Sequence, residues 1–362
     1  MEDDTFEDTP DGIGGTEIWE HMSEHRRTGT QDETNPEDNL EATFLTTEEK
    51  PNIPFEKVQT DPILREIGNT PLIPHPENEQ IVAKNERQNP TLSHKDRLGA
   101  GMILGLREKG ELEESQRVVE ASSGNTAGAV ALAANRLGHP CTIIMRESTS
   151  PVKQGFVKSL GAEVITAPDV GHEEHFYYQK VARRYAEEHD AVFLNQYERP
   201  LNRLVHYEWT GPELYKQIRK EGVTHIVGAV STCGLLTGVA EYIKEVDSHI
   251  KIVGVDGENS NVHRTFHEKK LGEYDVGIEG LGQWRVTETA NLAVLDDIKT
   301  VSDSIAVSRA KHEAEDNGLL MGLSSGAAME IAQQISQDEN DSRIVSIIHD
   351  GPEQYFHEVD GW

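Results

Sequence analysis

Residues 118–145 read VVEASSGNTAGAVALAANRLGHPCTIIM and decide the fold class. Val118–Ala121 is a short run of strand-forming residues, and a polar loop follows it. Thr126–Leu137 is predicted to be a helix that ends at Gly138, the residue type that commonly closes helices. Thr142–Met145 is a second apolar strand. This order of strand, loop, helix and strand predicts two parallel strands joined by a helix.

The same alternation continues on both sides of this stretch. Ile81–Lys84 is an expected strand, and Arg97–Lys109 is an expected helix. Further strands are expected at Val164–Thr166, Ala191–Leu194, His225–Val230, Lys251–Val255 and Arg343–Ile348. Further helices are expected at Pro151–Leu160, 173–189, Pro212–Glu221, Leu236–Glu245, Ser302–Asn317 and Ser325–Ile335. The pattern predicts an α/β fold of two lobes, each a mostly parallel twisted sheet with helices on both faces, and an active site in the cleft between them.

Length and charge divide the chain further. At about 150 residues per domain, 362 residues suggest two domains. Residues 1–60 carry 17 Asp and Glu against 4 Lys and Arg, so 1–55 is predicted to be an acidic, disordered extension. Residues 56–200 are expected to form the N-terminal lobe, and residues 201–362 the C-terminal lobe.

The overall charge excludes several classes of partner. The 34 Lys and Arg against 64 Asp and Glu give a net charge of −30, which argues against nucleic acid and anionic membranes. A charge of this size suggests a halophilic surface, with a generic acidic protein as the alternative. Two cysteines, an acidic N-terminus and the lack of a long apolar run predict a cytoplasmic location.

The stretch Asn89–Arg97 places Lys95 just inside an expected helix start, with Ser93 as N-cap and Asp96 completing a weak capping box. The positive end of the helix and a low-dielectric pocket would both lower the pKa of a lysine amine there. Such an amine is a nucleophile that can form a Schiff base. A surface lysine in a charged first turn is the alternative interpretation of this stretch alone.

Three further junctions carry polar or glycine residues where a strand leads into a helix, the place where open α/β sheets bind ligands. Glu120–Gly128 gathers hydroxyls, an amide and backbone N–H groups, which favour a carboxylate or phosphate. Val230–Gly238 is a small-residue turn that can wrap a phosphate, without Walker or dinucleotide glycine spacing. In Gly322–Ala328, Ser324 offers a neutral hydroxyl for a ring nitrogen. Ordinary caps and turns are the alternatives for each junction alone.

Seven motifs in this order resemble the cysteine synthase and cystathionine β-synthase family of pyridoxal-phosphate enzymes, which has the tryptophan synthase β-like fold (fold type II). The resemblance covers about residues 60–358. It implies pyridoxal 5'-phosphate as cofactor, small amino-acid substrates and a homodimer. The motifs are Ile67–Leu72 (IGNTPL), Asn89–Arg97 (NPTLSHKDR), Ser123–Thr126 (SGNT), Asn195–Tyr197 (NQY), Thr210–Glu213 (TGPE), Gly322–Ala327 (GLSSGA) and Asp350–Tyr355 (DGPEQY).

The resemblance implies a role for each matched residue. Lys95 would hold the cofactor as an internal Schiff base and then act as the base on the substrate Cα–H. Asn125 would contact the phenolic oxygen, and Ser324 the pyridine nitrogen. The expected cofactor contacts are Lys95, Asn125, Ser231, Thr232, Cys233, Gly234, Leu235 and Ser324. The expected substrate contacts are Ser122, Ser123, Gly124, Asn125, Thr126 and Gln196. No metal ligand is expected.

A serine at position 324 cannot keep the ring nitrogen protonated, so the ring is expected to be a weaker electron sink than one paired with a carboxylate. This favours β-replacement on an activated serine, O-acetylserine or O-phosphoserine, through an aminoacrylate, as in cysteine synthase. The alternatives are a lyase (serine/threonine deaminase or cysteine desulfhydrase) and β-replacement with an amine or homocysteine as nucleophile. A binding protein with vestigial catalysis, dependent on the acidic arm, is a third hypothesis.

The sequence also departs from the family pattern. Leu92 stands where many members have glycine, and His94, which precedes the lysine, is a candidate proton relay. The loop Ser231–Leu235 reads STCGL, where the common form is GTGGT. Leu235 therefore lacks a hydroxyl for the phosphate. The loop is closer to the Ser-Thr-Thr-Gly form of branches that include enzymes using O-phosphoserine and enzymes adding amines.

Overall fold

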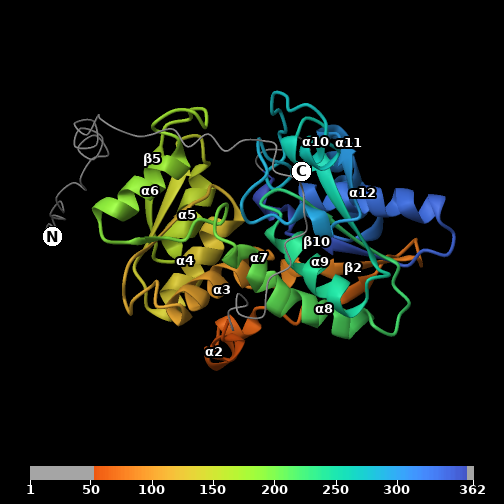
Figure 1. Ribbon diagram of the computed structural model, residues 1–362, viewed down its shortest axis with the longest axis horizontal. Helices are drawn as coiled ribbons and strands as arrows, with labels where there is room; N and C mark the ends of the chain where they lie inside the picture. The colour runs from red at the N-terminus through yellow and green to blue at the C-terminus, as the bar shows by residue number, and fades with distance from the viewer. Residues whose placement is uncertain (1–52, 357–362) are drawn as a thin grey trace, which may run out of the picture. The chain divides into compact units, whose positions relative to one another are not determined.

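The computed structural model describes residues 53–356, so the expected acidic extension at 1–55 lies almost entirely outside the described residues. It contains two sheets flanked by helices (Figure 1). The strands are β1 (Leu72–Pro74), β2 (Ile81–Asn85), β3 (Val118–Ala121), β4 (Cys141–Arg146), β5 (Glu163–Ala167), β6 (Val192–Phe193), β7 (His225–Ala229), β8 (Lys251–Gly257), β9 (Asp297–Val301) and β10 (Ile344–Ile348). The α-helices are α2 (Phe55–Thr60), α3 (Lys95–Glu108), α4 (Asn125–Leu137), α5 (Pro151–Ser159), α6 (Tyr178–Glu188), α7 (Leu201–Val205), α8 (Gly211–Ile218), α9 (Gly234–Val246), α10 (Asn261–Phe266), α11 (Asp303–Asn317) and α12 (Leu323–Asp338).

The four-stranded sheet, in the order β5-β4-β3-β6, grows from the stretch that decides the fold class. β3 and β4 are parallel, as predicted, with Val118 opposite Cys141. Side chains alternate between the two faces of a strand. Val118 therefore belongs to the core under α3 and α4, while its neighbour Val119 is buried outside that cluster. Since α6 also packs on β3 and β4, helices cover the sheet on both faces.

The six-stranded sheet, in the order β1-β2-β10-β7-β8-β9, shows the same alternation. Ile226 and Ile252 belong to the hydrophobic cluster that includes α8 and α9. Their neighbours Val227 and Val253 belong to the cluster that includes α11 and α12. Both faces are therefore covered, as expected for a parallel sheet. Only the pair β1–β2 at the edge is antiparallel, so the predicted mostly parallel α/β fold is confirmed.

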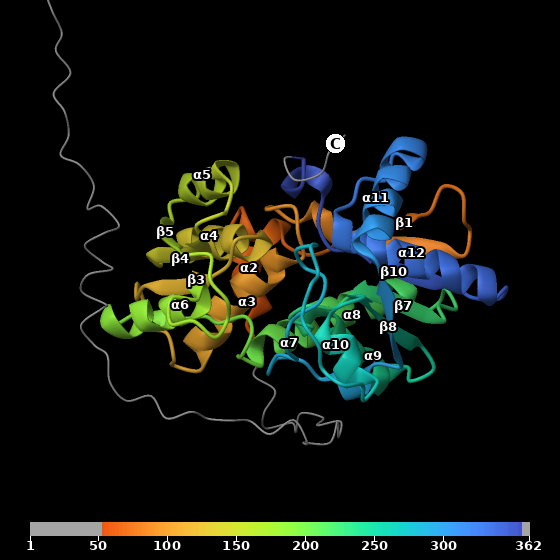
Figure 2. The ribbon, with the colours of Figure 1, turned by 90° about the horizontal axis from the view of Figure 1, so that it is seen from above.

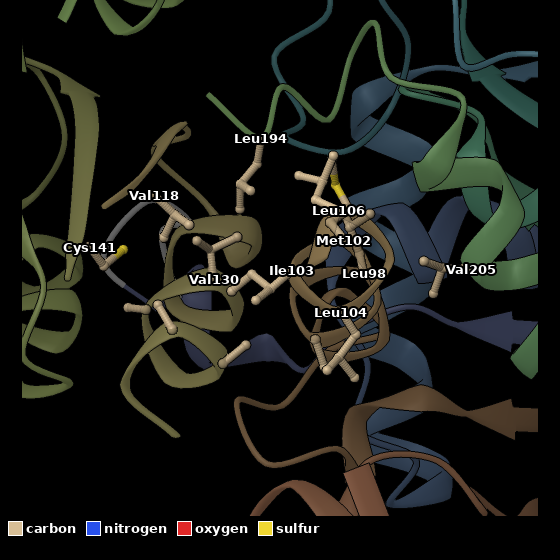
Figure 3. Packing of buried hydrophobic residues seen from close by; sticks show 14 of the residues in the cluster. Leu98, Met102, Ile103, Leu104, Leu106, Val118, Val130, Cys141, Leu194 and Val205 are labelled. Atoms are coloured by element: carbon tan, nitrogen blue, oxygen red, sulfur yellow. The ribbon is translucent and has the colours of Figure 1, made fainter. Parts of the chain in front are cut away.

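Helix α3 lies with α7 between the two sheets (Figure 2). In Figure 3 its side chains Leu98 and Ile103 lie between Val130 of α4 and Val205 of α7. A Cβ on Gly99 would come within 2.6 Å of the Ala129 carbonyl oxygen, so α3 and α4 approach closely because Gly99 has no side chain. This packing fixes the direction of the helix that begins at Lys95.

The strand pairing corrects the lobe boundary expected at residue 200. β1 and β2 lie before that boundary, yet β2 pairs in parallel with β10, Ile81 opposite Ile344. Residues 72–85 therefore belong to the sheet of the C-terminal half. The reason is burial, because Ile81 and Ala83 are fully buried and need a sheet that is covered on both faces.

The start of α3 also differs from the prediction. The N-cap position falls on His94, whose side chain makes no capping hydrogen bond. Ser93 Oγ instead accepts from the Lys95 N–H at 3.2 Å. Asp96 accepts from the backbone N–H and the hydroxyl of Thr91, at 2.6 and 2.5 Å. The buried carboxylate of Asp96 therefore joins the preceding loop to the first helical turn, and the expected Ser93–Asp96 capping box does not form.

Two classes of feature are absent from residues 53–356. No group of three or more His, Cys, Asp or Glu side chains is arranged to hold a metal ion. None of the helices in this range is long and apolar enough to cross a membrane.

Candidate active site

The predicted site residues gather in one cavity of about 300 Å³, to which both sheets contribute. Every sequence-predicted residue except Gly234 lines it. Gly234 lies behind the cavity wall, where a Cβ would collide with the side chain of Asn202. The lining residues from the prediction are Lys95, Ser122, Ser123, Gly124, Asn125, Thr126, Gln196, Ser231, Thr232, Cys233, Leu235 and Ser324.

Lys95 is the first residue of α3 and is buried at the cavity wall. Burial lowers the pKa of its amine to about 8, in the direction that the sequence predicts, while the charges of Glu120, Cys233 and Asp350 act against this shift. Glu120 is itself buried near the end of β3, which raises its pKa to about 8. About a tenth of Lys95 is therefore the uncharged, nucleophilic amine at pH 7, far more than for a lysine with the ordinary pKa of 10.5.

The loop Ser122–Gly124 and the first turn of α4 form one wall of the cavity. The Thr126 hydroxyl donates to Gln196 Oε1 at 2.8 Å, which joins this turn to the segment after β6. The Gly124 N–H donates to Ser122 Oγ at 3.2 Å. The wall presents hydroxyls, an amide and the positive end of a helix, a combination suited to a carboxylate.

The loop Ser231–Cys233, before α9, forms the opposite wall. Gln283 Nε2 donates to Ser231 Oγ at 3.2 Å, and the Thr287 hydroxyl donates to the Thr232 carbonyl at 2.8 Å. Cys233 has a left-handed backbone with φ of 64°, a conformation that only glycine adopts without strain. The α9 N-terminus and this small-residue loop are suited to a phosphate.

Asp350, Tyr355 and Asn125 meet at a third part of the cavity. Asp350 Oδ2 accepts from Asn125 Nδ2 and from the Tyr355 hydroxyl, both at 2.7 Å. Asn125 Oδ1 and Asp350 Oδ1 are buried acceptors that have no partner among residues 53–356. Ser324, near the start of α12, is a buried residue that lines the cavity.

His94 also lines the cavity. Its Nδ1 donates to the His349 carbonyl at 3.1 Å, and its ring centroid lies 5.5 Å from that of His349 and 6.0 Å from that of His206. Burial and the neighbouring Lys95 lower the pKa of His94 well below its usual value, so the ring is neutral. A proton relay through His94 stays a hypothesis.

Among the cavity-lining residues that sequence reasoning missed are Arg146, Tyr178, Tyr274 and Glu279. Arg146 ends β4, and Tyr178 begins α6. Glu279 forms a 2.9 Å ion pair with Lys153 of α5, which connects the two halves of the chain across the site. The sequence held one signal for Arg146: it stands at the end of an expected parallel strand, and the ends of such strands meet at ligand sites.

Comparison with known proteins places this arrangement in a family. The sequence pattern of the family "Pyridoxal-phosphate dependent enzyme" matches residues 63–350. A cysteine synthase of Buchnera aphidicola is 35% identical over 304 residues, which are 80% of this chain and 92% of that protein. A cystathionine beta-synthase of Apis mellifera is 32% identical over 312 residues, 83% of this chain and 61% of that protein.

Solved structures agree with the sequence relatives. O-acetyl serine sulfhydrylase isoform 3 from Entamoeba histolytica superimposes with a TM-score of 0.73 at 29% identity, over 81% of this chain and 89% of that one. O-ureido-L-serine synthase has a TM-score of 0.77 at 24% identity, over 82% of this chain and 93% of that one, and shows the fold alone.

The cavity fits the cofactor of this family. A phenolic hydroxyl has one proton to donate and would satisfy Asn125 Oδ1, a buried acceptor that has no partner within residues 53–356. The loop before α9 is suited to the phosphate, and the amine of Lys95 to an aldehyde carbon. With the family match over residues 63–350 and the similarity to cysteine synthases, the conclusion is that this chain belongs to the pyridoxal-phosphate-dependent enzymes and uses that cofactor.

Proposed function

We propose that this enzyme replaces the β-substituent of an activated serine, O-acetylserine or O-phosphoserine, in the manner of a cysteine synthase. The observation that carries the proposal is the single cavity shared by the Lys95 amine, the polar wall at 122–126 and the Ser324 hydroxyl. The similarity to cysteine synthases over four fifths of the chain supports serine β-replacement at the level of the family.

The polar wall holds the substrate by its α-carboxylate. The hydroxyls of Ser122, Ser123 and Thr126 and the positive end of α4 favour a carboxylate over a neutral group. The 2.8 Å hydrogen bond from Thr126 to Gln196 orders this wall before substrate binds. Binding there orients the substrate so that its Cα–H bond faces Lys95 on the neighbouring helix.

Lys95 is the residue that takes the proton from the substrate Cα. When bound, pyridoxal phosphate withdraws electrons from the substrate Cα and so acidifies its C–H bond. The uncharged Nζ of Lys95 takes this proton, and a pKa of about 8 leaves about a tenth of the amine in that form at pH 7 and about half at pH 8. Ser324 does not supply the charge that a carboxylate would give the ring nitrogen. Loss of the proton from Cα would therefore be coupled to departure of the β-substituent as acetate or phosphate.

The test is product formation by the purified holoenzyme with each donor and sulfide. We expect cysteine from O-acetylserine or O-phosphoserine, and little keto acid when sulfide is omitted. Keto acid at the same rate with and without sulfide would contradict the proposal and identify a lyase. Product that forms only with amines or homocysteine would keep β-replacement and change the nucleophile. The Lys95→Ala variant, which lacks the amine, is the matched control.

We also propose a homodimer with a salt-adapted surface in a reducing cytoplasm. The net charge of −30 supports the salt adaptation. Cys141 and Cys233 are both buried and free, which is consistent with a reducing compartment. Light scattering in low and molar salt tests the homodimer and the salt-adapted surface. We expect a mass twice that of one chain and greater stability of this dimer in high salt.

A further inference from the structure

The backbone of Arg146 lies beside the wall that we propose for the α-carboxylate. It is the last residue of β4, and its backbone N–H donates to Ser123 Oγ at 3.1 Å. Its side chain lines the same cavity as Lys95 and Ser324. Together with Lys95 it is one of the two Lys or Arg side chains lining this cavity, and the roles proposed above leave it without a function.

The surroundings of Arg146 consist of phenols. Its guanidinium lies 5.0 Å from the centre of the Tyr178 ring, and Tyr177 and Tyr197 are further neighbours. The hydroxyls of Tyr178 and Tyr197 are 3.1 Å apart. Burial raises the pKa of Tyr274, which also lines the cavity, to about 12, so its hydroxyl stays a hydrogen-bond donor at neutral pH. The cluster therefore offers one permanent positive charge and several donors.

Arg146 has no acidic partner. Within residues 53–356 its guanidinium forms no ion pair, although the chain contains 64 Asp and Glu against 34 Lys and Arg. Lys153, in the helix that follows, is paired with Glu279 at 2.9 Å. The Arg146 side chain is exposed to solvent, so its guanidinium is accessible to an anion that enters the cavity.

We infer that Arg146, with the hydroxyls of Tyr178 and Tyr197, binds an anionic group at the end of the substrate remote from its α-carboxylate. The inference rests on the proposed function. The planar guanidinium fork fits a phosphate or carboxylate through two parallel hydrogen bonds. Such a group has two sources: the phosphate ester of O-phosphoserine as the donor, or the carboxylate of an acidic thiol as the nucleophile.

The first experiment compares donors on the holoenzyme at constant ionic strength. Arg146→Gln removes the charge, and Arg146→Lys keeps the charge but loses the fork. With sulfide as nucleophile, Arg146→Gln should lower kcat/KM for O-phosphoserine about tenfold to a hundredfold, the loss expected for a charged hydrogen bond. The kcat/KM for neutral O-acetylserine should change less than twofold. For O-phosphoserine, the kcat/KM of Arg146→Lys should lie between those of the wild type and Arg146→Gln. Arg183→Gln makes the same change outside the cavity, in a side chain paired with Glu198, and should change neither value.

The second experiment compares nucleophiles with O-acetylserine as donor. If the carboxylate of the nucleophile is the source, Arg146→Gln should slow the reaction of mercaptoacetate tenfold or more and leave that of neutral 2-mercaptoethanol unchanged. An equal effect of Arg146→Gln on charged and neutral partners in both experiments, or no effect in either, overturns the inference.

Calorimetry separates failure of this inference from failure of the proposed function. If the wild type turns over no donor, the proposed function fails. Titration of the holoenzyme with O-phosphoserine, mercaptoacetate and serine then decides the inference by binding alone. Arg146→Gln must weaken binding of O-phosphoserine or of mercaptoacetate and leave serine unchanged. If Arg146→Gln weakens the binding of all three compounds equally, or of none, the inference is overturned. The absorption band of the bound cofactor and the thermal unfolding temperature show that each variant is folded and loaded.

Discussion

Arg97 Nε donates to Glu86 Oε2 at 2.7 Å, and both side chains are fully buried. Glu213 of α8 accepts two more hydrogen bonds from the same guanidinium, at 2.8 and 2.9 Å. Arg97 lies two residues after Lys95, so this network anchors the first turn of α3. None of these three residues lines the cavity. Arg97 and Glu213, each from one of the motifs that carry the family resemblance, therefore position the lysine rather than touch the ligand.

Breaking this buried pair is expected to destabilise the protein strongly. Glu86→Gln removes the fully buried one of the two carboxylates that pair with Arg97, and breaking a buried pair costs about 3–5 kcal/mol. Urea unfolding measures the loss. Glu163→Gln, which removes an exposed partner of Arg117, is the control and should cost at most about 1 kcal/mol. A cost for Glu86→Gln no larger than that of the control would show that the network does not hold α3.

The same pair predicts how stability depends on pH. Burial opposes the charge of Glu86, but Arg97 outweighs burial and holds the pKa of Glu86 well below its usual value. The folded pKa is therefore lower than the unfolded one. Its stabilising contribution is complete above the unfolded pKa of about 4.5 and is lost as pH falls toward the folded pKa. The difference in unfolding free energy between wild type and Glu86→Gln should shrink below about pH 4.5. A constant difference from pH 7 to pH 3 would contradict this assignment.

Lys95→Ala is expected to remove both the covalent hold on the cofactor and turnover. No other lysine lines the cavity, so no second amine can replace it. The visible band of the cofactor and the product assay give the two readouts. Lys109→Ala, at the exposed far end of the same helix, should change neither. Turnover that survives in Lys95→Ala would overturn the site assignment.

Uptake of cofactor is expected to depend on the charge of Lys95. Only the uncharged amine can bond to an aldehyde carbon, and burial lowers its pKa to about 8. In protein stripped of cofactor, the rate of pyridoxal phosphate uptake should therefore rise as pH increases through about 8. Because the charge of Glu120 raises the pKa of Lys95, Glu120→Gln should move the midpoint to lower pH. A midpoint near 10.5, the ordinary value, would contradict the burial argument.

Leu92 is expected to be a strained position. Its φ is 66°, and a leucine there costs about 1 kcal/mol relative to a residue that tolerates the left-handed region. Leu92→Asn should raise the unfolding free energy, and the β-branched Leu92→Val should lower it by about 1 kcal/mol or more. Leu320, of similar exposure but with an ordinary φ, is the control. Equal losses for Leu92→Val and Leu320→Val would rule out backbone strain.

Two positions where the chain departs from the family pattern have a common structural explanation. Leu92 and Cys233 stand where relatives commonly have glycine, and both adopt a positive φ. The backbone therefore keeps the conformation that glycine favours although the side chain has changed. The family pattern identified the departures, and the structure shows that both positions keep a left-handed backbone.

The sequence by itself determined the alternation of strands and helices, the start of α3 near Lys95 and the polar turn at 122–126. These features depend on contacts between residues a few positions apart, such as strand alternation and helix periodicity, which a sequence displays directly. The parallel arrangement of β3 and β4 follows from the single helix between them.

Only the tertiary structure decided which sheet includes β2 and which side chains line the cavity in addition to the predicted ones. β2 pairs with β10, and Asp350 meets Asn125, across more than 200 residues of sequence. Arg146 faces the phenols of Tyr178 and Tyr197 because α6 packs on β3 and β4 and brings its first residue to the strand ends. No local pattern encodes these contacts, since they arise when separately formed elements bury their apolar faces against one another.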